Sequence, residues 1–126
     1  MVPKWPSNIS NKIAEIVKKA EIVNDSIAIS EYESDDQNVN IIAAKAADEL
    51  LTIGGINASF VLGKIGDKIY ISGRSIGGIN VQLILEKLGG GGHITLAGAQ
   101  LENMSMEDAK QELINRINEY FFEIEN

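Results

Sequence analysis

A predicted β-hairpin at the centre of the chain constrains the fold more than any other feature of the sequence. Residues 58–64 and 68–74 are rich in β-branched and other apolar side chains, and the short segment between them contains Gly66 and Asp67. A glycine–aspartate pair between two such segments is typical of a tight hairpin turn. We therefore expect an antiparallel strand pair, on which the flanking elements pack.

Apolar residues at three- and four-residue spacing predict helices on both sides of this hairpin. One helix follows residue 10, a second covers residues 39–51, and a third covers residues 80–88. Ser105 and Asp108 have the spacing of a capping box and predict the start of a last helix. The apolar stripe of this last helix carries Ala109, Leu113, Ile117 and Phe121.

Two further segments are predicted to extend the sheet. Residues 22–31 alternate and are β-branched, which predicts one strand. Residues 94–99 are ambiguous, with alanine and leucine favouring a short helix, and Gln100-Leu101 is expected to begin a final strand. Because helices and strands alternate along the chain, the sequence predicts an α/β domain with a mixed sheet of four or five strands and packed helices.

Length and charge restrict the classes of function. The 126 residues are enough for one domain, which we expect to span residues 11–126 after a linker or cloning remnant at residues 1–10. There is no cysteine, and the net charge is −7. This charge disfavours binding to long nucleic acid, so any phosphate group must be recognised by a local set of hydrogen-bond donors.

Four consecutive glycines followed by the only histidine form the first candidate site, Gly89, Gly90, Gly91, Gly92 and His93. Glycines allow close approach of a ligand to the backbone and can turn N–H groups toward an anion. The alternative is a flexible linker, which is the commoner meaning of a glycine run. The histidine could donate to a phosphate or stack on a base, or it could be a structural residue bonded to the backbone.

Arg74 and Ser75 form the second candidate site, at the end of a predicted strand and before Gly77-Gly78. An arginine there can form paired hydrogen bonds with a phosphate, whereas the alternative is a solvated surface side chain. Asn80 is interpreted as the N-cap of the next helix. The aspartates show no spacing typical of a two-metal site, so we expect this chain by itself to bind a ligand and to hydrolyse no phosphodiester.

Taken in order, the segments Ala58-Ser59-Phe60-Val61, Ile71-Ser72-Gly73-Arg74-Ser75, Asn80-Val81-Gln82 and Leu88 to His93 resemble the DHHA1 domain. They are most similar to the C-terminal domain of membrane-anchored bacterial cyclic di-AMP phosphodiesterases. The resemblance implies that Arg74 and Ser75 contact phosphate and that Gly90 to His93 form the substrate loop. Gly73, where the family usually has alanine, and Leu96, where it commonly has asparagine, depart from the pattern.

The same resemblance implies partners and a location. A preceding DHH domain of the same polypeptide would hold two Mn²⁺ ions, and no cofactor is expected in this chain. The substrate would be cyclic di-AMP or a short oligonucleotide, at the cytoplasmic face of the bacterial membrane, and a homodimer is compatible with this arrangement. Two alternatives remain, the DHHA1 domain of an oligoribonuclease and a non-catalytic RNA- or nucleotide-binding module.

Overall fold

The computed structural model describes residues 7–125 and contains four helices and six strands within that range. The elements, in chain order, are α1 Ser7–Lys18, β1 Glu21–Val23, β2 Ile27–Glu33, α2 Val39–Leu50, β3 Ala58–Ile65, β4 Lys68–Ser75, α3 Val81–Glu86, β5 Gly91–Gly92, β6 Leu96–Glu102 and α4 Met106–Glu125. The predicted α/β class is therefore confirmed.

All the strands belong to one mixed sheet with the order β1-β2-β3-β4-β6-β5. Strands β2 and β3 are parallel, and every other neighbouring pair is antiparallel. The predicted hairpin is confirmed, since β3 and β4 pair along their whole length and are joined by Gly66 and Asp67. Gly66 has a φ of 59°, which is the left-handed backbone that glycine adopts without strain.

The predicted strand count of four or five was too low for two reasons. Residues 22–31 are divided between β1 and β2, because Asn24 and Asp25 turn the chain with φ values of 49° and 67°. Asparagine and aspartate tolerate this backbone better than most residues, and such pairs are found in hairpin turns. The second reason is β5, an edge strand of two glycines that pairs with β6.

The short helix considered for residues 94–99 was wrong. Leu96 begins strand β6, which pairs with β4 from Arg74–Leu96 to Lys68–Glu102. A ladder of this length supplies hydrogen bonds to the whole segment, and tertiary pairing of this kind overrides the weak helix propensity of alanine and leucine.

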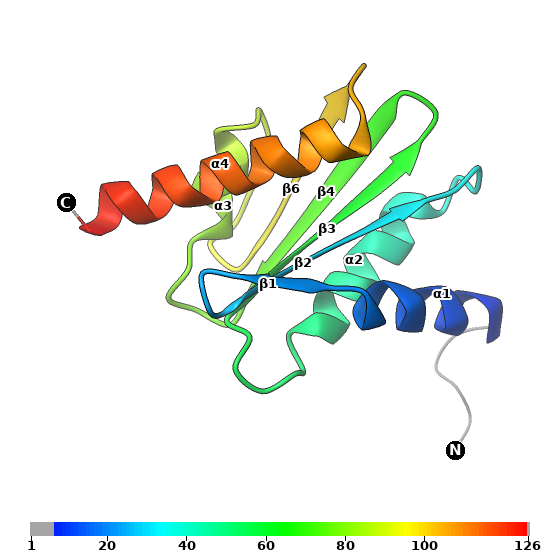
Figure 1. The fold of residues 1–126 in the computed structure, drawn as a ribbon, viewed down its shortest axis with the longest axis horizontal. Coiled ribbons are helices and arrows are strands. Elements are labelled where there is room, and N and C mark those ends of the chain that lie inside the picture. The colour runs from blue at the N-terminus through cyan, green and yellow to red at the C-terminus, as the bar shows by residue number, and fades with distance from the viewer. Residues whose placement is uncertain (1–6, 126) are drawn as a thin grey trace.

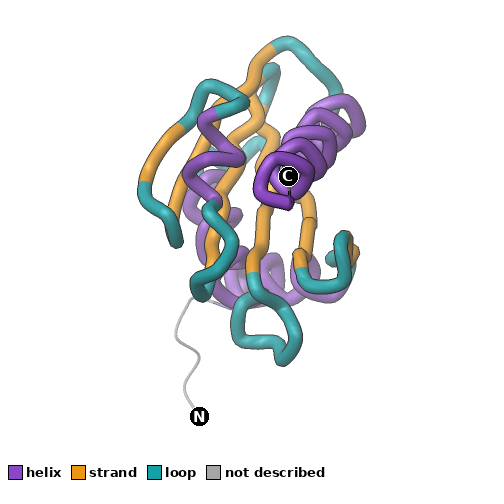
Figure 2. The backbone as a smooth tube through the Cα atoms, turned by 90° about the vertical axis from the view of Figure 1, so that its left-hand side faces the viewer, coloured by secondary structure: helices purple, strands orange, loops and turns teal. Residues whose placement is uncertain are grey.

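Helices cover both faces of the sheet, as Figure 1 and Figure 2 show. On one face, α1 and α2 pack around a core that includes Ile16, Ile42 and Val61. On the other face, α3 and α4 pack on a larger core centred on Phe60, Leu85 and Leu113. The first pair of helices lies over β2, β3 and β4, so β6 is left open beside α2.

Buried hydrogen bonds attach the first pair of helices to the sheet. The hydroxyl of Ser30 on β2 donates to the carbonyl oxygen of Ile16, and that of Ser59 on β3 donates to the carbonyl oxygen of Ala47, at 2.6 and 2.7 Å. Each bond provides a partner for a carbonyl near the C-terminal end of a helix, where intrahelical partners run out. Helix α2 is thereby held at a defined position along the sheet.

Both predicted helix caps are confirmed. The side chain of Asn80 accepts a hydrogen bond from the Leu83 N–H at 3.0 Å, and Ser105 Oγ accepts one from the Asp108 N–H at 3.0 Å. The last helix buries Tyr120 together with Ala109, Leu113 and Ile117, while Phe121 is only partly buried. Four-residue steps drift around a helix of 3.6 residues per turn, so residue 120 faces the core better than residue 121.

The first helix begins earlier than predicted, at Ser7. Residues 7–10, assigned above to a linker, are its first turn, and Ile9 packs against the core beneath α1 and α2. The rest of that segment, including both prolines, lies outside the described residues. Within residues 7–125, none of the helices is both long enough and apolar enough to cross a bilayer.

Candidate functional site

Three pairs of side chains across β4 and β6 form the floor of an open groove. The pairs are Arg74–Leu96, Ser72–Gly98 and Tyr70–Gln100. Alternate residues of a strand face the same side, and residues directly opposite one another share that side, so all six positions face the side of the sheet on which α2 packs. The floor is thus an arginine–leucine pair, a small central pair and a tyrosine–glutamine pair.

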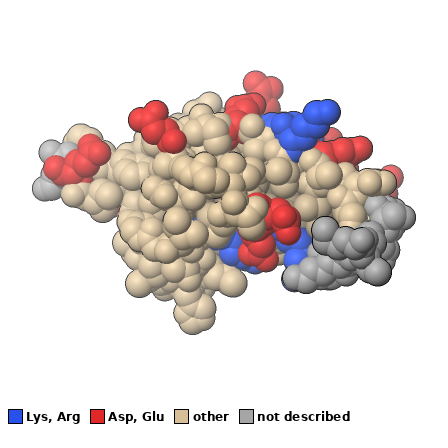
Figure 3. Space-filling view, turned by 90° about the horizontal axis from the view of Figure 1, so that it is seen from below, with Lys and Arg blue, Asp and Glu red and all other residues tan. Residues whose placement is uncertain are grey.

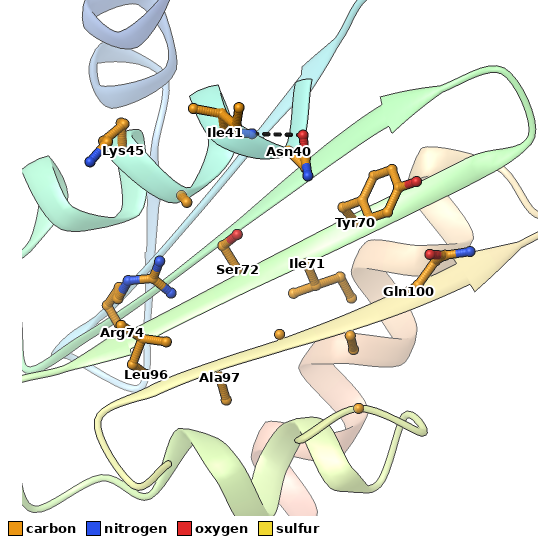
Figure 4. A pocket seen from close by; sticks show the side chains of 14 residues that line it. Asn40, Ile41, Lys45, Tyr70, Ile71, Ser72, Arg74, Leu96, Ala97 and Gln100 are labelled. Atoms are coloured by element: carbon orange, nitrogen blue, oxygen red, sulfur yellow. Dashed lines mark hydrogen bonds between the residues drawn. The ribbon is translucent and has the colours of Figure 1, made fainter. Parts of the chain in front are cut away.

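Helix α2 forms the wall of this groove. Its exposed and half-exposed residues Asn40, Ile41, Ala44 and Lys45 line a volume of about 640 Å³ together with β4, β6 and Gly90. Figure 4 shows Arg74 with Leu96 at one end of the groove and Tyr70 with Gln100 at the other. Ile41 and Leu96 are 53% and 50% exposed, so the groove presents apolar as well as polar surface.

Arg74 is held in place by the protein before any ligand binds. Its Nε donates to Asp48 Oδ1 of α2 at 2.9 Å, and its Nη1 donates to the Gly73 carbonyl oxygen at 2.9 Å. The arginine side chain is only 13% exposed. Among the described residues, Nη2 has no hydrogen-bond partner, so the guanidinium presents this nitrogen to an incoming acceptor. Arg74 is therefore not the solvated surface side chain of the alternative interpretation.

Most of the glycine run is explained by the fold itself. Gly89 ends α3 with a φ of 85°, and its N–H and that of Gly90 donate to the carbonyl oxygens of Glu86 and Leu85. This pattern is a Schellman motif. A Cβ on Gly90 would lie 2.1 Å from Gly98 O, and one on Gly92 would lie 2.5 Å from Leu96 O, so both glycines allow close packing on β6.

Gly91 is the exception in the run. A Cβ there would meet no atom within 4 Å, and the φ of Gly91 is outside the left-handed range. The fold described here would accept a side chain at this position. The flexible-linker interpretation is wrong, because residues 89–92 cap a helix and form an edge strand.

The backbone N–H groups of the run differ in what they can offer to a ligand. Gly90 N–H is used by the helix cap, at 2.8 Å from Leu85 O. His93 and Leu96 exchange two hydrogen bonds, and such pairs alternate with non-bonded pairs in an antiparallel ladder. Gly92, opposite Ala97, is therefore a non-bonded position, whose N–H faces outward from the sheet edge. Of the three amides from Gly90 to Gly92 that were predicted to serve a ligand, that of Gly92 is the one directed away from the sheet.

The predicted site segments are neighbours in the fold. Residues 93–96 form a tight turn, which two neighbouring segments hold in place. The Ser75 N–H donates a hydrogen bond to Thr95 O and the Val81 N–H donates one to Ile94 O, both at 3.0 Å. His93 is opposite Leu96 in the closing pair of this hairpin, so its side chain faces the same side of the sheet as Leu96 and Arg74. The strand end at Arg74 and the glycine–histidine loop thus meet at one corner of the sheet.

His93 and Ser75 differ in their availability. The His93 side chain is exposed, and its ring has no partner among residues 7–125, which disfavours a purely structural histidine. Ser75, by contrast, is 6% exposed and its Oγ accepts the Gly77 N–H at 3.0 Å. As the residue next to Arg74 on a strand, it faces the opposite side of the sheet. The phosphate contact expected of Ser75 stays a prediction, and in the structure its hydroxyl stabilises the turn after β4.

Sequence reasoning missed the residues that complete the groove. These are Asn40, Ile41, Ala44, Lys45, Asp48, Tyr70 and Gln100. They come from α2 and from alternate positions of β4 and β6, and no motif links them along the chain. The signal that could have indicated them was alternation on β4, where Tyr70, Ser72 and Arg74 are polar residues between apolar ones.

Gly73, the first departure from the family pattern, has a packing reason. A Cβ there would lie 3.0 Å from Phe60 Cε1 and 3.1 Å from Leu85 Cδ1, so the phenylalanine ring occupies the room that an alanine would need. Leu96, the second departure, gives one end of the groove an exposed apolar side chain.

The distribution of charge supports local rather than diffuse recognition. Figure 3 shows one face on which acidic groups are scattered over mostly uncharged surface, with few basic groups. The hydrogen bonds that Arg116 donates to Glu119 and Glu112 raise the pKa of its guanidinium, and Arg116 lies on α4 across the sheet from the groove. Among the described residues, no three His, Asp or Glu side chains are grouped so as to hold a metal ion.

The sequence is similar to one known domain and to characterised proteins. Residues 22–123 match the DHHA1 domain. Cyclic-di-AMP phosphodiesterase GdpP of Geobacillus thermodenitrificans is 43% identical over 111 residues, which cover 87% of this chain and 17% of that protein. Cyclic-di-AMP phosphodiesterase PdeA of Listeria monocytogenes is 43% identical over 109 residues, which cover 86% and 17%. The chain thus spans about a sixth of the length of these relatives.

A solved structure shares the fold. The crystal structure of an exopolyphosphatase-related protein from Bacteroides fragilis matches with a TM-score of 0.80 and 17% identity, over 98% of this chain and 38% of that one. At this level of identity the likeness concerns the arrangement of helices and strands. It supports the mixed sheet with helices on both faces.

Proposed function

The chain belongs to the DHHA1 domain family, and from this premise we propose that it is the nucleotide-binding half of a manganese-dependent cyclic di-AMP phosphodiesterase. The relatives at 43% identity are named for this activity, which supports the choice of substrate. The two metal ions would lie in a DHH domain of the same polypeptide, where they would activate water and stabilise the leaving oxygen. That the full-length enzyme is anchored in the membrane and faces the cytoplasm is a prediction from the resemblance.

One observation carries this proposal, the position of Arg74 and His93 at one corner of the sheet, with the Gly92 N–H at the adjoining edge. Arg74 lies on β4, His93 in the turn after β5, and Gly92 on the edge strand. The hydrogen bonds that the Ser75 and Val81 N–H groups donate to that turn hold these segments together. A dinucleotide carries two anionic phosphates. In a chain of net charge −7, a few oriented donors are the physical means of binding them.

Each group would contribute a different interaction. Arg74 donates from Nη2, and its bonds to Asp48 and Gly73 fix the plane of the guanidinium, so little side-chain entropy is lost on binding. The Gly92 N–H is an uncharged donor on the edge strand. His93 supplies a ring that can donate to phosphate or stack on a base. These groups bind and orient the nucleotide, and the bond-breaking step belongs to the metal-containing domain.

The kinetic test uses the polypeptide that contains both domains. Arg74→Ala and His93→Ala should each lower kcat/KM for cyclic di-AMP at least about tenfold, since a hydrogen bond to a charged group contributes about 1.5–3 kcal/mol. Lys68→Ala is the matched control, because Lys68 is a cation on the same face of β4 at its opposite, exposed end. Its kcat/KM should stay within about twofold of the parent value.

The readout of stability separates binding from structure. His93→Ala should leave the melting temperature unchanged, because its ring is exposed. Arg74→Ala removes a partly exposed ion pair and should cost about 1 kcal/mol or less. If both variants keep the kcat/KM of the parent, Arg74 and His93 do not bind the substrate. If the two-domain polypeptide hydrolyses no cyclic di-AMP, the proposed activity is refuted.

A non-catalytic RNA-binding module is the less favoured alternative. Long RNA is bound largely through phosphate contacts by lysine and arginine, and affinity then falls steeply with salt. The chain has 11 basic and 18 acidic residues, which opposes such binding.

A further inference from the structure

We propose that the groove between α2 and strands β4 and β6 is a nucleoside subsite, which takes one adenine nucleotide with its phosphate at Arg74 and its base at Tyr70. This inference deepens the proposed function and rests on it for the class of ligand. The position of the groove, its shape and its polar groups come from the fold, and residues outside the glycine–histidine loop form most of it.

The groove is hollow because its middle is made of small residues. Ser72 and Gly98 face one another across the two strands, and Ala44 of α2 lines the space beside them. A volume of about 640 Å³ falls within the range of small-molecule sites. From Tyr70 to Arg74 the strand rises about 13 Å, at about 3.3 Å per residue, which is comparable to the span from base to phosphate in a nucleotide.

The end at Tyr70 offers an aromatic ring and complementary amide groups. Gln100, opposite Tyr70, uses its Nε2 to bond Glu102, so its Oε1 is left to accept a hydrogen bond. Asn40 uses its Oδ1 to accept the Ile41 N–H, so its Nδ2 is left to donate, as Figure 4 shows. One acceptor and one donor match the amino group and a ring nitrogen of adenine, the pairing that asparagine and glutamine make with this base.

The opposite end suits a phosphate group. Arg74 lies there, its Nη2 has no hydrogen-bond partner among the described residues, and Lys45 of α2 lines the same end (Figure 4). Asp48 forms an ion pair with Arg74, so recognition at this end depends on the donor geometry of the guanidinium rather than on a net positive charge. Apolar surface from Ile41 on the wall and from Leu96 beside Arg74 would cover the base and the ribose. A ligand with one anionic end and one flat heterocyclic end fits this order better than an apolar peptide.

The test uses the 126-residue chain and two glycine substitutions. Gly98→Leu places a side chain in the groove, since a Cβ there has its nearest contact at 3.4 Å, to Ile71 O, and an ordinary φ. Gly54→Leu is the matched control, because Gly54 also has an ordinary φ and no atom within 4 Å, and it lies in the loop between α2 and β3. Melting temperatures establish that both variants fold.

Binding is followed by amide chemical-shift changes on titration with AMP, GMP, ribose 5-phosphate and cyclic di-AMP. We expect AMP to shift the amides of Ile41, Tyr70 and Gln100, with GMP and ribose 5-phosphate binding at least about fivefold more weakly. Gly98→Leu should raise the Kd for AMP at least tenfold, and Gly54→Leu should leave it unchanged. Gln100→Ala should reduce the preference for AMP over GMP.

Two negative results have different meanings. If cyclic di-AMP shifts the amides around His93 while AMP binds the Gly98→Leu variant as it binds the parent, the subsite is refuted and the proposed function stands. If neither nucleotide shifts any amide of the parent chain, the subsite and the binding role of the chain are both refuted. Equal binding of AMP and ribose 5-phosphate would refute recognition of the base.

Discussion

Alanine substitutions at Gly90 and Gly91 distinguish the glycines that the fold requires from the one that it does not. At Gly90 the new Cβ would lie 2.1 Å from Gly98 O and 2.7 Å from Ala99 Cβ. The obstacle is the backbone of β6, which is hydrogen-bonded along β4 and cannot move as a side chain would. At Gly91 the new Cβ meets nothing within 4 Å.

The expected magnitudes differ strongly. Overpacking typically costs about 1–3 kcal/mol and occasionally more, so we expect Gly90→Ala to lose about 3 kcal/mol, because a backbone atom is the obstacle. For a domain of this size, that corresponds to a fall in melting temperature of about 10 °C. Gly91→Ala should stay within about 0.5 kcal/mol of the parent. It should nevertheless weaken cyclic di-AMP binding about tenfold, because a methyl group on the edge strand obstructs approach to the Gly92 N–H.

Thermal unfolding followed by circular dichroism gives the stability, and calorimetric titration with cyclic di-AMP gives the affinity. A Gly90→Ala protein as stable as the parent would refute the described packing of β5 against β6. A Gly91→Ala protein with parent affinity would show that the glycine run serves the fold alone. Both the stability and the affinity must be measured for each variant, because only a variant that loses binding without losing stability supports contact with the ligand.

Three further predictions concern activity and stability. The 126-residue chain with cyclic di-AMP and Mn²⁺ should release no product, and turnover of about 1 per second or faster would contradict this. Ser59→Ala should lower the free energy of unfolding by about 1–2 kcal/mol in a denaturant titration, since it leaves the Ala47 carbonyl without its buried donor, and nucleotide binding should not change. Tyr120→Phe removes the hydroxyl that accepts the Asn80 N–H at 2.9 Å and should cost about 1 kcal/mol, a loss that Leu83→Ala on the exposed side of α3 should not reproduce.

Local signals predicted much of the fold correctly. The hairpin at Gly66-Asp67 and the caps at Asn80 and Ser105 depend on the chemistry of a few neighbouring residues, and all three are present. The errors arose where distant strands decide the structure. Residues 94–99 have no strong preference of their own, and pairing with β4 makes them a strand.

For the candidate site, the sequence predicted that Arg74 and the glycine–histidine loop lie close together, but not which groups of these segments face a ligand. The proximity of Arg74 to the glycine–histidine loop was expected and is observed. That the Ser75 side chain faces the core, and that Gly90 uses its N–H in a helix cap, depends on register and pleating, which a motif does not specify.

The sequence by itself determined the family, the α/β class and the residues of the glycine–histidine loop, because these depend on patterns within short segments. Only the tertiary structure decided that α2 covers β2 to β4 and leaves β6 open, and that Asp48 orients Arg74. The physical reason is that a groove is formed by side chains from three elements, placed by the packing of a helix on a sheet. The small residues at positions 44, 72 and 98 belong to no recognisable sequence motif. In the fold they lie together and create the space for a ligand.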